Sequence, residues 1–389
     1  MKTANDTFLI SFLQRFDQHP FDVKLHGKTH HIGKGNPAFV VDFREGIESK
    51  ELLTSTSLAL GEAYMKRTME IEGDLFFALD HFLGQMGQFS TDYGKLKKLL
   101  FSSQSKKNQE KEVTSHYDIG NEFYSLWLDE TMSYSCGYFK NETSTLYEAQ
   151  CDKVERILKK LYLKSDMELL DIGCGWGYLL IRAAKEYGVK AHGITLSKEQ
   201  KKEFEKQIEA EGLTGRVTVE LMDYRELEKS GRTFDRVVSV GMLEHVGRPN
   251  YELFIKNVNA VLKPEGLFLL HYISALKEYP GDPWIKKYIF PGGMIPSLRE
   301  MLHIMAEYNF YTLDVESLRR HYYRTLRCWE ENFTKHRKEI EIRMGGEFTR
   351  MWELYLAACA ATFHNGIIDL DQILISKGVN NDLPMTRWY

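Results

Sequence analysis

At residues 169–177 the chain reads Leu-Leu-Asp-Ile-Gly-Cys-Gly-Trp-Gly, an apolar run that ends in glycines. An apolar strand that turns directly into a helix favours glycine at the turn, because glycine adopts backbone conformations that other residues avoid. Such a turn also lets a ligand approach the backbone near a helix N-terminus. The stretch predicts a strand, a turn and a helix that bind a nucleotide-containing ligand. A tight turn without a ligand would have the same pattern.

The dinucleotide-binding fingerprint fits this turn poorly. That fingerprint requires Gly-x-Gly-x-x-Gly and an acidic residue about 20 positions later. Here Tyr178 takes the place of the third glycine, and the next predicted strand ends in Gly-Ile-Thr-Leu-Ser at 193–197. Both departures argue against NAD.

Strand-like segments alternate with helical ones around this turn. They lie at 168–172, 190–195, 217–222, 236–240 and 267–273, and a helical segment at 146–161 precedes them. The alternation predicts a doubly wound, Rossmann-like α/β domain with helices on both faces of a parallel sheet. Residues 280–293 contain too many turn formers for one long helix. We interpret 276–300 as a cap, followed by strand-like segments at 310–318 and 367–376 and helical segments at 321–333 and 348–363.

The N-terminal part has a different pattern. Strand-like stretches at 21–28 and 38–43 precede helical spacing at 51–69 and 73–86, so residues 1–101 are predicted to form a small α+β domain. Residues 102–112 contain no apolar side chain and are typical of a solvated linker. Residues 113–389 then form the larger domain.

Composition excludes several classes of protein. The 389 residues contain 51 Lys and Arg against 55 Asp and Glu, which argues against a dedicated nucleic-acid binder. No apolar run reaches the length of a membrane span, and no leader pattern opens the chain, so we expect a cytoplasmic protein. The five cysteines are scattered without Cys-x-x-Cys spacing, which predicts neither disulfides nor a metal site.

The glycine turn resembles the loop of S-adenosylmethionine-dependent class I methyltransferases. The resemblance implies that the loop admits the methionyl part of S-adenosylmethionine, that Asp171 supports the loop and the ligand's ammonium, and that other positions hold the ribose and adenine. The implied cofactor residues are Tyr134, Ser135, Asp171, Gly173, Gly175, Gly177, Thr195, Leu196, Gln200, Asp223 and Tyr224.

Further motifs resemble the cyclopropane-fatty-acyl-phospholipid synthases, which are related to the mycolic acid cyclopropane synthases. They are His-Tyr-Asp-Ile-Gly-Asn at 116–121, Tyr-Ser-Cys-Gly-Tyr-Phe at 134–139, Val-Gly-Met-Leu-Glu-His-Val-Gly at 240–247, Phe-Leu-Leu-His at 268–271 and Asp-Pro-Trp-Ile-Lys-Lys-Tyr-Ile-Phe-Pro-Gly-Gly at 282–293. They occur in the family's order. The N-terminal extension favours the phospholipid enzymes over the mycolic acid enzymes.

The resemblance implies methylene addition to the cis double bond of an acyl chain in a membrane phospholipid. This chemistry needs the alkene held in line with the sulfonium methyl in a dry pocket, and a base that removes a proton. In the family the base is bicarbonate. The implied anion-binding residues are Cys136 and Ile273 through their backbones, and Glu244, His271 and Tyr322 through their side chains.

Several of these residues also have plainer interpretations. Glu244 follows an apolar strand, where a carboxylate often caps a helix, and His271 fits a core histidine. Cys136 could equally be a buried residue that only packs in the core. Tyr323 lies beside Tyr322, although the match to His-Tyr-x-x-Thr-Leu selects Tyr322. The sequence after His271, Tyr-Ile-Ser at 272–274, differs from that of many family members, which have a smaller residue and glycine at this place.

Cys359 lies in an Ala-rich helical segment and shares an apolar face with Phe348, Met351, Tyr355 and Phe363. Apolar neighbours raise a thiol pKa, so we expect Cys359 to pack rather than react.

A phospholipid substrate implies peripheral docking at the inner face of the cell membrane. Residues 284–290 mix aromatic side chains with Lys286 and Lys287, which suits contact with an anionic lipid surface and equally suits a packed cap. The N-terminal domain is expected to contact lipid, orient the larger domain or support a homodimer. Two other functions stay open: a small-molecule N- or C-methyltransferase, and a lipid carrier with a vestigial loop.

Overall fold

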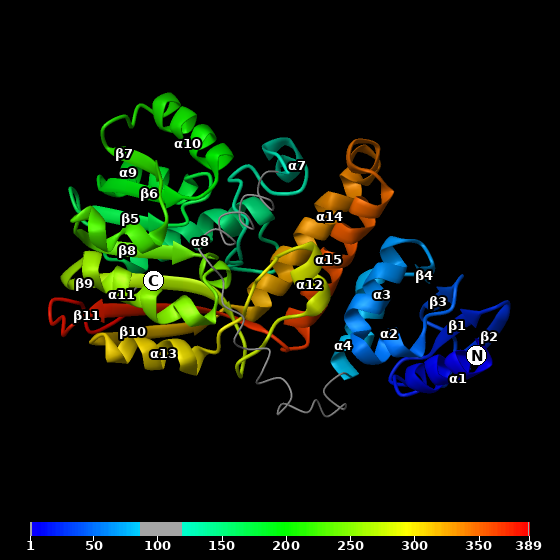
Figure 1. Cartoon of the computed structure of the whole chain (residues 1–389). Coiled ribbons are helices and arrows are strands. Elements are labelled where there is room, and N and C mark those ends of the chain that lie inside the picture. Colours follow the sequence, from blue (N-terminus) through cyan, green and yellow to red (C-terminus); the bar gives the residue numbers. More distant parts are fainter. Residues whose placement is uncertain (1, 86–118, 388) are drawn as a thin grey trace. The chain divides into compact units, whose positions relative to one another are not determined.

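The computed structural model describes residues 2–85, 119–387 and 389, which fall into two compact units (Figure 1). One unit contains the described residues up to 85 with Gly281–Pro291 and Leu326–Ile367. The other contains the described residues from 119 to 280 with Gly292–Thr325 and Ile368–Tyr389. The predicted linker at 102–112 and residues 116–118 of the first motif lie outside the described residues. The sequence did not indicate that C-terminal helices group with the N-terminal part.

The first unit contains a four-stranded sheet in the order β2-β1-β3-β4. The predicted helical stretch at 51–69 is two helices, and a strand begins at Met69. The second helix starts after Ser55, whose side chain accepts a hydrogen bond from the backbone of Leu58 and caps it. The elements are α1 (Lys2–Leu13), β1 (Phe21–Leu25), β2 (Lys28–Ile32), β3 (Val40–Phe43), α2 (Ser49–Thr54), α3 (Thr56–Met65), β4 (Met69–Glu72), α4 (Leu75–Gln85), α12 (Pro283–Tyr288) and α15 (Gly346–His364), with α14 (Arg319–Met344) from Leu326 onward.

The second unit contains a seven-stranded sheet in the order β10-β11-β9-β8-β5-β6-β7. The strands from β9 to β7 are parallel. At the other edge β11 is antiparallel to both of its neighbours, β9 and β10. The predicted doubly wound fold is confirmed. The strands are β5 (Glu168–Ile172), β6 (Lys190–Thr195), β7 (Val217–Leu221), β8 (Phe234–Val240), β9 (Leu262–Ser274), β10 (Phe310–Ser317) and β11 (Asp369–Lys377).

Helices cover both faces of this sheet. Buried side chains of α8 (Leu146–Lys160), α9 (Tyr178–Tyr187) and α10 (Lys198–Ala210) form one apolar core, and those of α11 (Tyr251–Val261) and α13 (Leu298–Glu307) form the other. The remaining elements of the unit are α7 (Asn121–Ser125), η3 (Tyr224–Glu226), η4 (Glu228–Ser230), η5 (Leu243–His245), η6 (Arg248–Asn250) and the start of α14.

The order of the strands in the sheet indicates where a ligand would bind. The chain passes from β5 to β6 and β7 on one side, and β8 and β9 lie on the other side of β5. In open α/β sheets ligands bind beyond the carboxyl ends of the strands where the order reverses. The glycine turn follows β5 and Glu244 follows β8, so both lie at this point.

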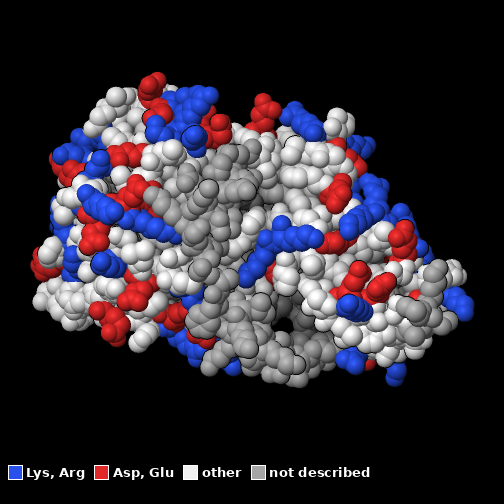
Figure 2. Space-filling model, viewed as in Figure 1, with Lys and Arg blue, Asp and Glu red and all other residues white. Residues whose placement is uncertain are grey.

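On the face shown in Figure 2, acidic and basic side chains are interspersed, as the balanced composition would produce. None of the helices in the described ranges is long and apolar enough to cross a membrane.

Candidate active site

The glycine turn is built from left-handed backbone. Gly173, Gly175 and Gly177 have φ of 86°, 56° and 88°. A Cβ added at Gly177 would lie 2.1 Å from the ring of Phe204, and one at Gly173 would lie 2.9 Å from the side chain of Met242. A Cβ at Gly175 meets nothing within 4 Å. Gly173 and Gly177 are therefore required by packing, whereas the space above Gly175 is open to a ligand.

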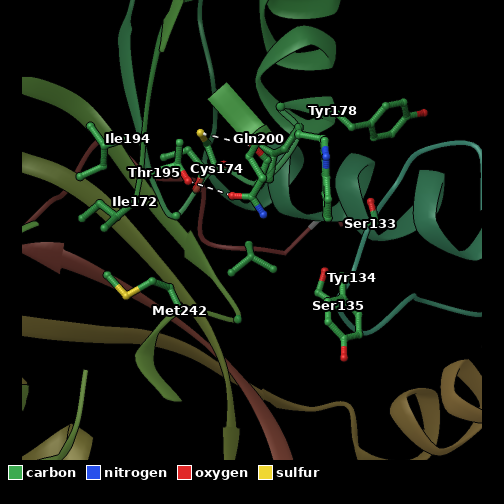
Figure 3. A pocket seen from close by; sticks show the side chains of 18 of the residues that line it. Ser133, Tyr134, Ser135, Ile172, Cys174, Tyr178, Ile194, Thr195, Gln200 and Met242 are labelled. Atoms are coloured by element: carbon green, nitrogen blue, oxygen red, sulfur yellow. Dashed lines mark hydrogen bonds between the residues drawn. The ribbon is translucent and has the colours of Figure 1, made fainter. Parts of the chain in front are cut away.

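The turn opens onto a pocket, shown in part in Figure 3. Residues implied by the methyltransferase resemblance line it: Tyr134, Ser135, Asp171, Gly173, Gly175, Gly177, Thr195, Leu196, Gln200 and Tyr224. His245 and Lys153 also line it, although neither was predicted to be a site residue. Asp223 is not among the lining residues. Its carboxylate instead accepts from the backbone of Arg225 and pairs with that guanidinium at 3.1 Å.

The end of β6 is tied to the start of α10. The Thr195 hydroxyl donates to Oε1 of Gln200 at 2.8 Å, drawn as a dashed line in Figure 3. Ser197 caps α10 by accepting from the backbone N–H of Gln200. Because Gln200 accepts through its carbonyl, its amide N–H groups stay available as donors. A ribose hydroxyl is a fitting acceptor for such donors.

Asp171 and Lys153 place opposite charges in the pocket wall. Asp171 is 3% exposed, and its Oδ1 has no hydrogen-bond partner among the described residues. Burial raises the pKa of Asp171 to about 7, while Lys153 opposes the rise. The open space at Gly175 and the orphaned acceptor of Asp171 fit a ligand with an amino group, as S-adenosylmethionine has.

A second cluster adjoins this pocket at the ends of β8 and β9. The pocket residue Gly241 donates its backbone N–H to the carbonyl of His271 at 2.8 Å. Glu244 accepts through Oε1 from the backbone N–H of Ile273 at 2.6 Å. The structure therefore brings together Glu244, His271 and Ile273. It also shows that the Ile273 amide, implied to hold the anion, is bonded to Glu244.

Two buried polar atoms of this cluster have no hydrogen-bond partner among the described residues. They are Oε2 of Glu244 and Nε2 of His271. Burial raises the pKa of Glu244 to about 7 and lowers the pKa of His271 to about 3. The neutral imidazole and the carboxyl group each have one polar atom without a partner in the described part of the chain. Together they fit a small polar ligand that can both donate and accept hydrogen bonds.

Gln372 selects the tautomer of His271. The two residues are cross-strand partners on β11 and β9, and Gln372 Nε2 lies 3.2 Å from His271 Nδ1. With its amide nitrogen toward the ring, as in the structure, Gln372 donates to Nδ1, and the ring proton then lies on Nε2. His271 thus presents an N–H donor. No local sequence pattern points to Gln372, because it lies 101 residues from its partner and in no recognised motif.

Cys136 and Tyr322 lie near each other. The Cys136 thiol donates to the carbonyl of Leu318 at 3.9 Å, and the backbone N–H of Tyr322 donates to the same carbonyl at 3.0 Å. Both residues are buried. Burial raises the pKa of the Cys136 thiol well above its usual range, so the thiol stays protonated. The charge of Lys153 opposes that rise and, after burial, also lowers the pKa of His271.

The cap residues do not form an exposed aromatic surface. In the first unit Trp284 and Ile289 are buried, and Trp284 Nε1 donates to Sδ of Met65 at 3.3 Å. The hypothesis that 284–290 presents these side chains to lipid is therefore wrong for Trp284 and Ile289. Both are packed inside the first unit, Trp284 against residues of α3. Cys359 also lies in this unit, and burial raises its thiol pKa to about 12.

The chain is similar in sequence to known proteins of one enzyme family. Residues 104–373 match the family described as mycolic acid cyclopropane synthetase, and residues 8–92 match a family of unknown function. The cyclopropane-fatty-acyl-phospholipid synthase of Escherichia coli is 41% identical over 344 residues, which are 87% of this chain and 88% of that protein.

Two solved structures are similar to the chain. The cyclopropane synthase MmaA2 from Mycobacterium tuberculosis is 34% identical with a TM-score of 0.65. The mycolic acid cyclopropane synthase CmaA1, complexed with S-adenosylhomocysteine (SAH) and CTAB, is 33% identical with a TM-score of 0.65. Each match covers 69% of this chain and 98% of the other.

Proposed function

The chain belongs to the mycolic acid cyclopropane synthetase family, and we propose that it forms cyclopropane rings on unsaturated acyl chains of membrane phospholipids, with bicarbonate as the base. It is an S-adenosylmethionine-dependent methyltransferase. The similar protein of Escherichia coli is named for phospholipid acyl chains, which favours a phospholipid over a mycolic acid.

The observation that carries the proposal is the pair of unmet buried atoms beside the cofactor pocket, Oε2 of Glu244 and Nε2 of His271. A simple amine acceptor needs no anion site, whereas ring closure needs a base. Bicarbonate has a hydroxyl that Glu244 would accept from and oxygens that His271 would bind through Nε2–H. The two side chains fit this anion by donor and acceptor type.

S-adenosylmethionine, when bound, supplies the methyl carbon that becomes the ring methylene. Asp171, Thr195 and Gln200 would bind its polar groups, and Gly175 leaves room for it. Tyr224 would lie against the adenine. Glu244 and His271 would hold the base beside the reacting carbon. Cys136, from the segment before α8, and Tyr322, at the start of α14, would complete the anion site.

The acyl chain must leave the bilayer to reach this pocket, so the proposal includes peripheral docking at the inner face of the membrane. The N-terminal part would orient the enzyme there or support a homodimer. Cosedimentation with anionic phospholipid vesicles tests the docking, and light scattering tests the oligomeric state.

Mass spectrometry of phospholipids from cells that express the protein tests the proposal. We expect monounsaturated chains to gain one CH2 in the wild type, with loss of the product in Glu244→Ala and a reduced yield in Tyr322→Phe. Unchanged phospholipids, together with methylation of a soluble amine by the purified protein, would favour the small-molecule alternative.

A further inference from the structure

Lys153 is a buried cation in the wall of the cofactor pocket. It lies on α8, is 4% exposed, and donates from Nζ to Oγ of Ser135 at 3.0 Å. Among the described residues, Ser135 Oγ is its one hydrogen-bond acceptor, although an ammonium carries three N–H donors. A buried ammonium is costly unless an anion compensates it.

Lys153 also fixes the direction of the Ser135 hydroxyl. Because Oγ accepts from Lys153, the hydroxyl proton must point to another acceptor. Ser135 lines the pocket, so that acceptor would be a group of the ligand. Figure 3 shows Ser135 on the side of the pocket that lies across from Ile172 and Met242.

The carboxylate of Asp171 lines the same pocket and is close enough for the Lys153 charge to lower its pKa. The pocket wall thus contains the carboxylate of Asp171, with one oxygen unpartnered among the described residues, and the ammonium of Lys153, which donates to the hydroxyl of Ser135. An amino acid zwitterion needs this combination: its ammonium suits Asp171 and its carboxylate suits Ser135 and Lys153.

We propose that Lys153 is the positioning residue that holds the α-carboxylate of the cofactor's methionyl group, acting through the hydroxyl of Ser135. This inference rests on the assignment of S-adenosylmethionine to the pocket. It does not depend on bicarbonate or on the lipid.

A purely structural role would be to anchor the segment that carries Ser135. Gln150, one turn earlier on α8, already does so: its Nε2 donates to the carbonyls of Ser135 and Ser133 at 2.9 and 3.3 Å. Removing the charge of Lys153 therefore leaves this anchor in place, which makes Lys153→Gln an informative variant.

Calorimetry with SAH and its decarboxylated form tests the proposal. The wild type should bind SAH at least tenfold more tightly, because a charge-assisted hydrogen bond to the carboxylate is worth roughly tenfold or more in affinity. Lys153→Gln should lose that preference: it should weaken SAH binding by at least tenfold more than binding of the decarboxylated ligand. Any further rise in the pKa of Asp171 affects the ammonium of both ligands alike. Ser135→Ala should reduce the same preference, and it provides the readout if Lys153→Gln does not fold.

Lys160→Gln is the matched control. Lys160 is a second buried lysine of α8, but it pairs with Asp314 and Glu316 and does not line the pocket. Its loss should leave the preference for SAH intact. An equal loss of affinity for both ligands in Lys153→Gln would overturn the role of Lys153 alone. Failure of the wild type to bind either ligand would overturn the cofactor assignment as well.

Discussion

The backbone N–H of Ile273 donates a 2.6 Å hydrogen bond to Oε1 of Glu244. This contact holds a carboxylate from the end of β8 against the neighbouring strand β9 and leaves Oε2 buried without a partner among the described residues. Oε1 thus fixes the Glu244 side chain, and Oε2 is available to hydrogen-bond a ligand.

Glu244→Gln should abolish most turnover while preserving the fold. The glutamine carbonyl can still accept from Ile273, but the amide that replaces Oε2 is a donor and cannot accept from a bicarbonate hydroxyl. We expect roughly a 100-fold or greater loss of lipid product. SAH affinity, measured by calorimetry, should not change. Wild-type turnover in this variant would contradict the role of Glu244.

The same variant should change the pH dependence of stability. The pKa of Glu244 rises from 4.5 to about 7 on folding, so the folded protein keeps the side chain protonated where the unfolded chain ionises it. Stability associated with Glu244 is present below pH 4.5 and is lost as the pH rises to about 7. Relative to Glu244→Gln, the wild type should lose at most about 3 kcal/mol of unfolding free energy over this range. Denaturant titrations at several pH values measure the difference, and parallel curves would refute it.

Gln372→Glu should switch His271 to the other tautomer, with the ring proton on Nδ1. A carboxylate at this position accepts from Nδ1–H and draws the ring proton away from Nε2. We expect turnover to fall roughly 100-fold, because His271 can then no longer donate to the anion. Gln372→Leu serves as the control that removes the amide without imposing the other tautomer. NMR of the imidazole nitrogens reads the tautomer directly, and an unchanged spectrum in Gln372→Glu would exclude this explanation.

Two alanine substitutions in the glycine turn should separate binding from folding. Gly175→Ala meets no atom within 4 Å, so it should cost only about 1 kcal/mol of stability for its left-handed backbone and should weaken SAH binding. Gly177→Ala would place Cβ 2.1 Å from Phe204 and should destabilise the fold by roughly 3 kcal/mol. Thermal melts and calorimetry distinguish the two. Equal destabilisation would show that the space at Gly175 is not a binding space.

Cys359→Ala should retain turnover close to the wild type. Burial raises the pKa of this thiol to about 12, so a thiolate nucleophile is scarce at neutral pH. Lipid product formation by the purified variant measures the effect. Loss of turnover without loss of thermal stability would reopen a catalytic role for Cys359.

Local patterns predicted the sheet well. The expected limits of β5 and β6 match the structure, because alternation and flanking glycines mark short buried strands. Other limits were set by tertiary pairing. β9 begins at Leu262 rather than 267, because its first residue pairs with Phe234 of β8. α14 continues to Met344, well past the predicted end at 333.

Site residues that lie in sequence motifs were predicted. Those that reach the site through strand pairing or from a helix distant in sequence were missed. Glu244 and His271 lie in recognisable motifs, but Gln372 and Lys153 belong to none of these motifs. Gln372 reaches His271 through strand pairing, and Lys153 reaches Ser135 from a helix 18 residues later. Burial of Trp284 depends on a close approach to Gly61, which no local pattern reveals.

The central claim is that a buried glutamate and histidine hold bicarbonate beside the cofactor to complete ring formation on a phospholipid chain. Mass spectrometry of monounsaturated phospholipid vesicles incubated with purified enzyme and S-adenosylmethionine, with and without bicarbonate in buffer freed of carbon dioxide, tests it most directly. We predict that chains gain one CH2 and lose their double bond when bicarbonate is present, and that product nearly disappears without it. Equal ring formation in both buffers, or a methylated chain that keeps its double bond, would contradict the claim.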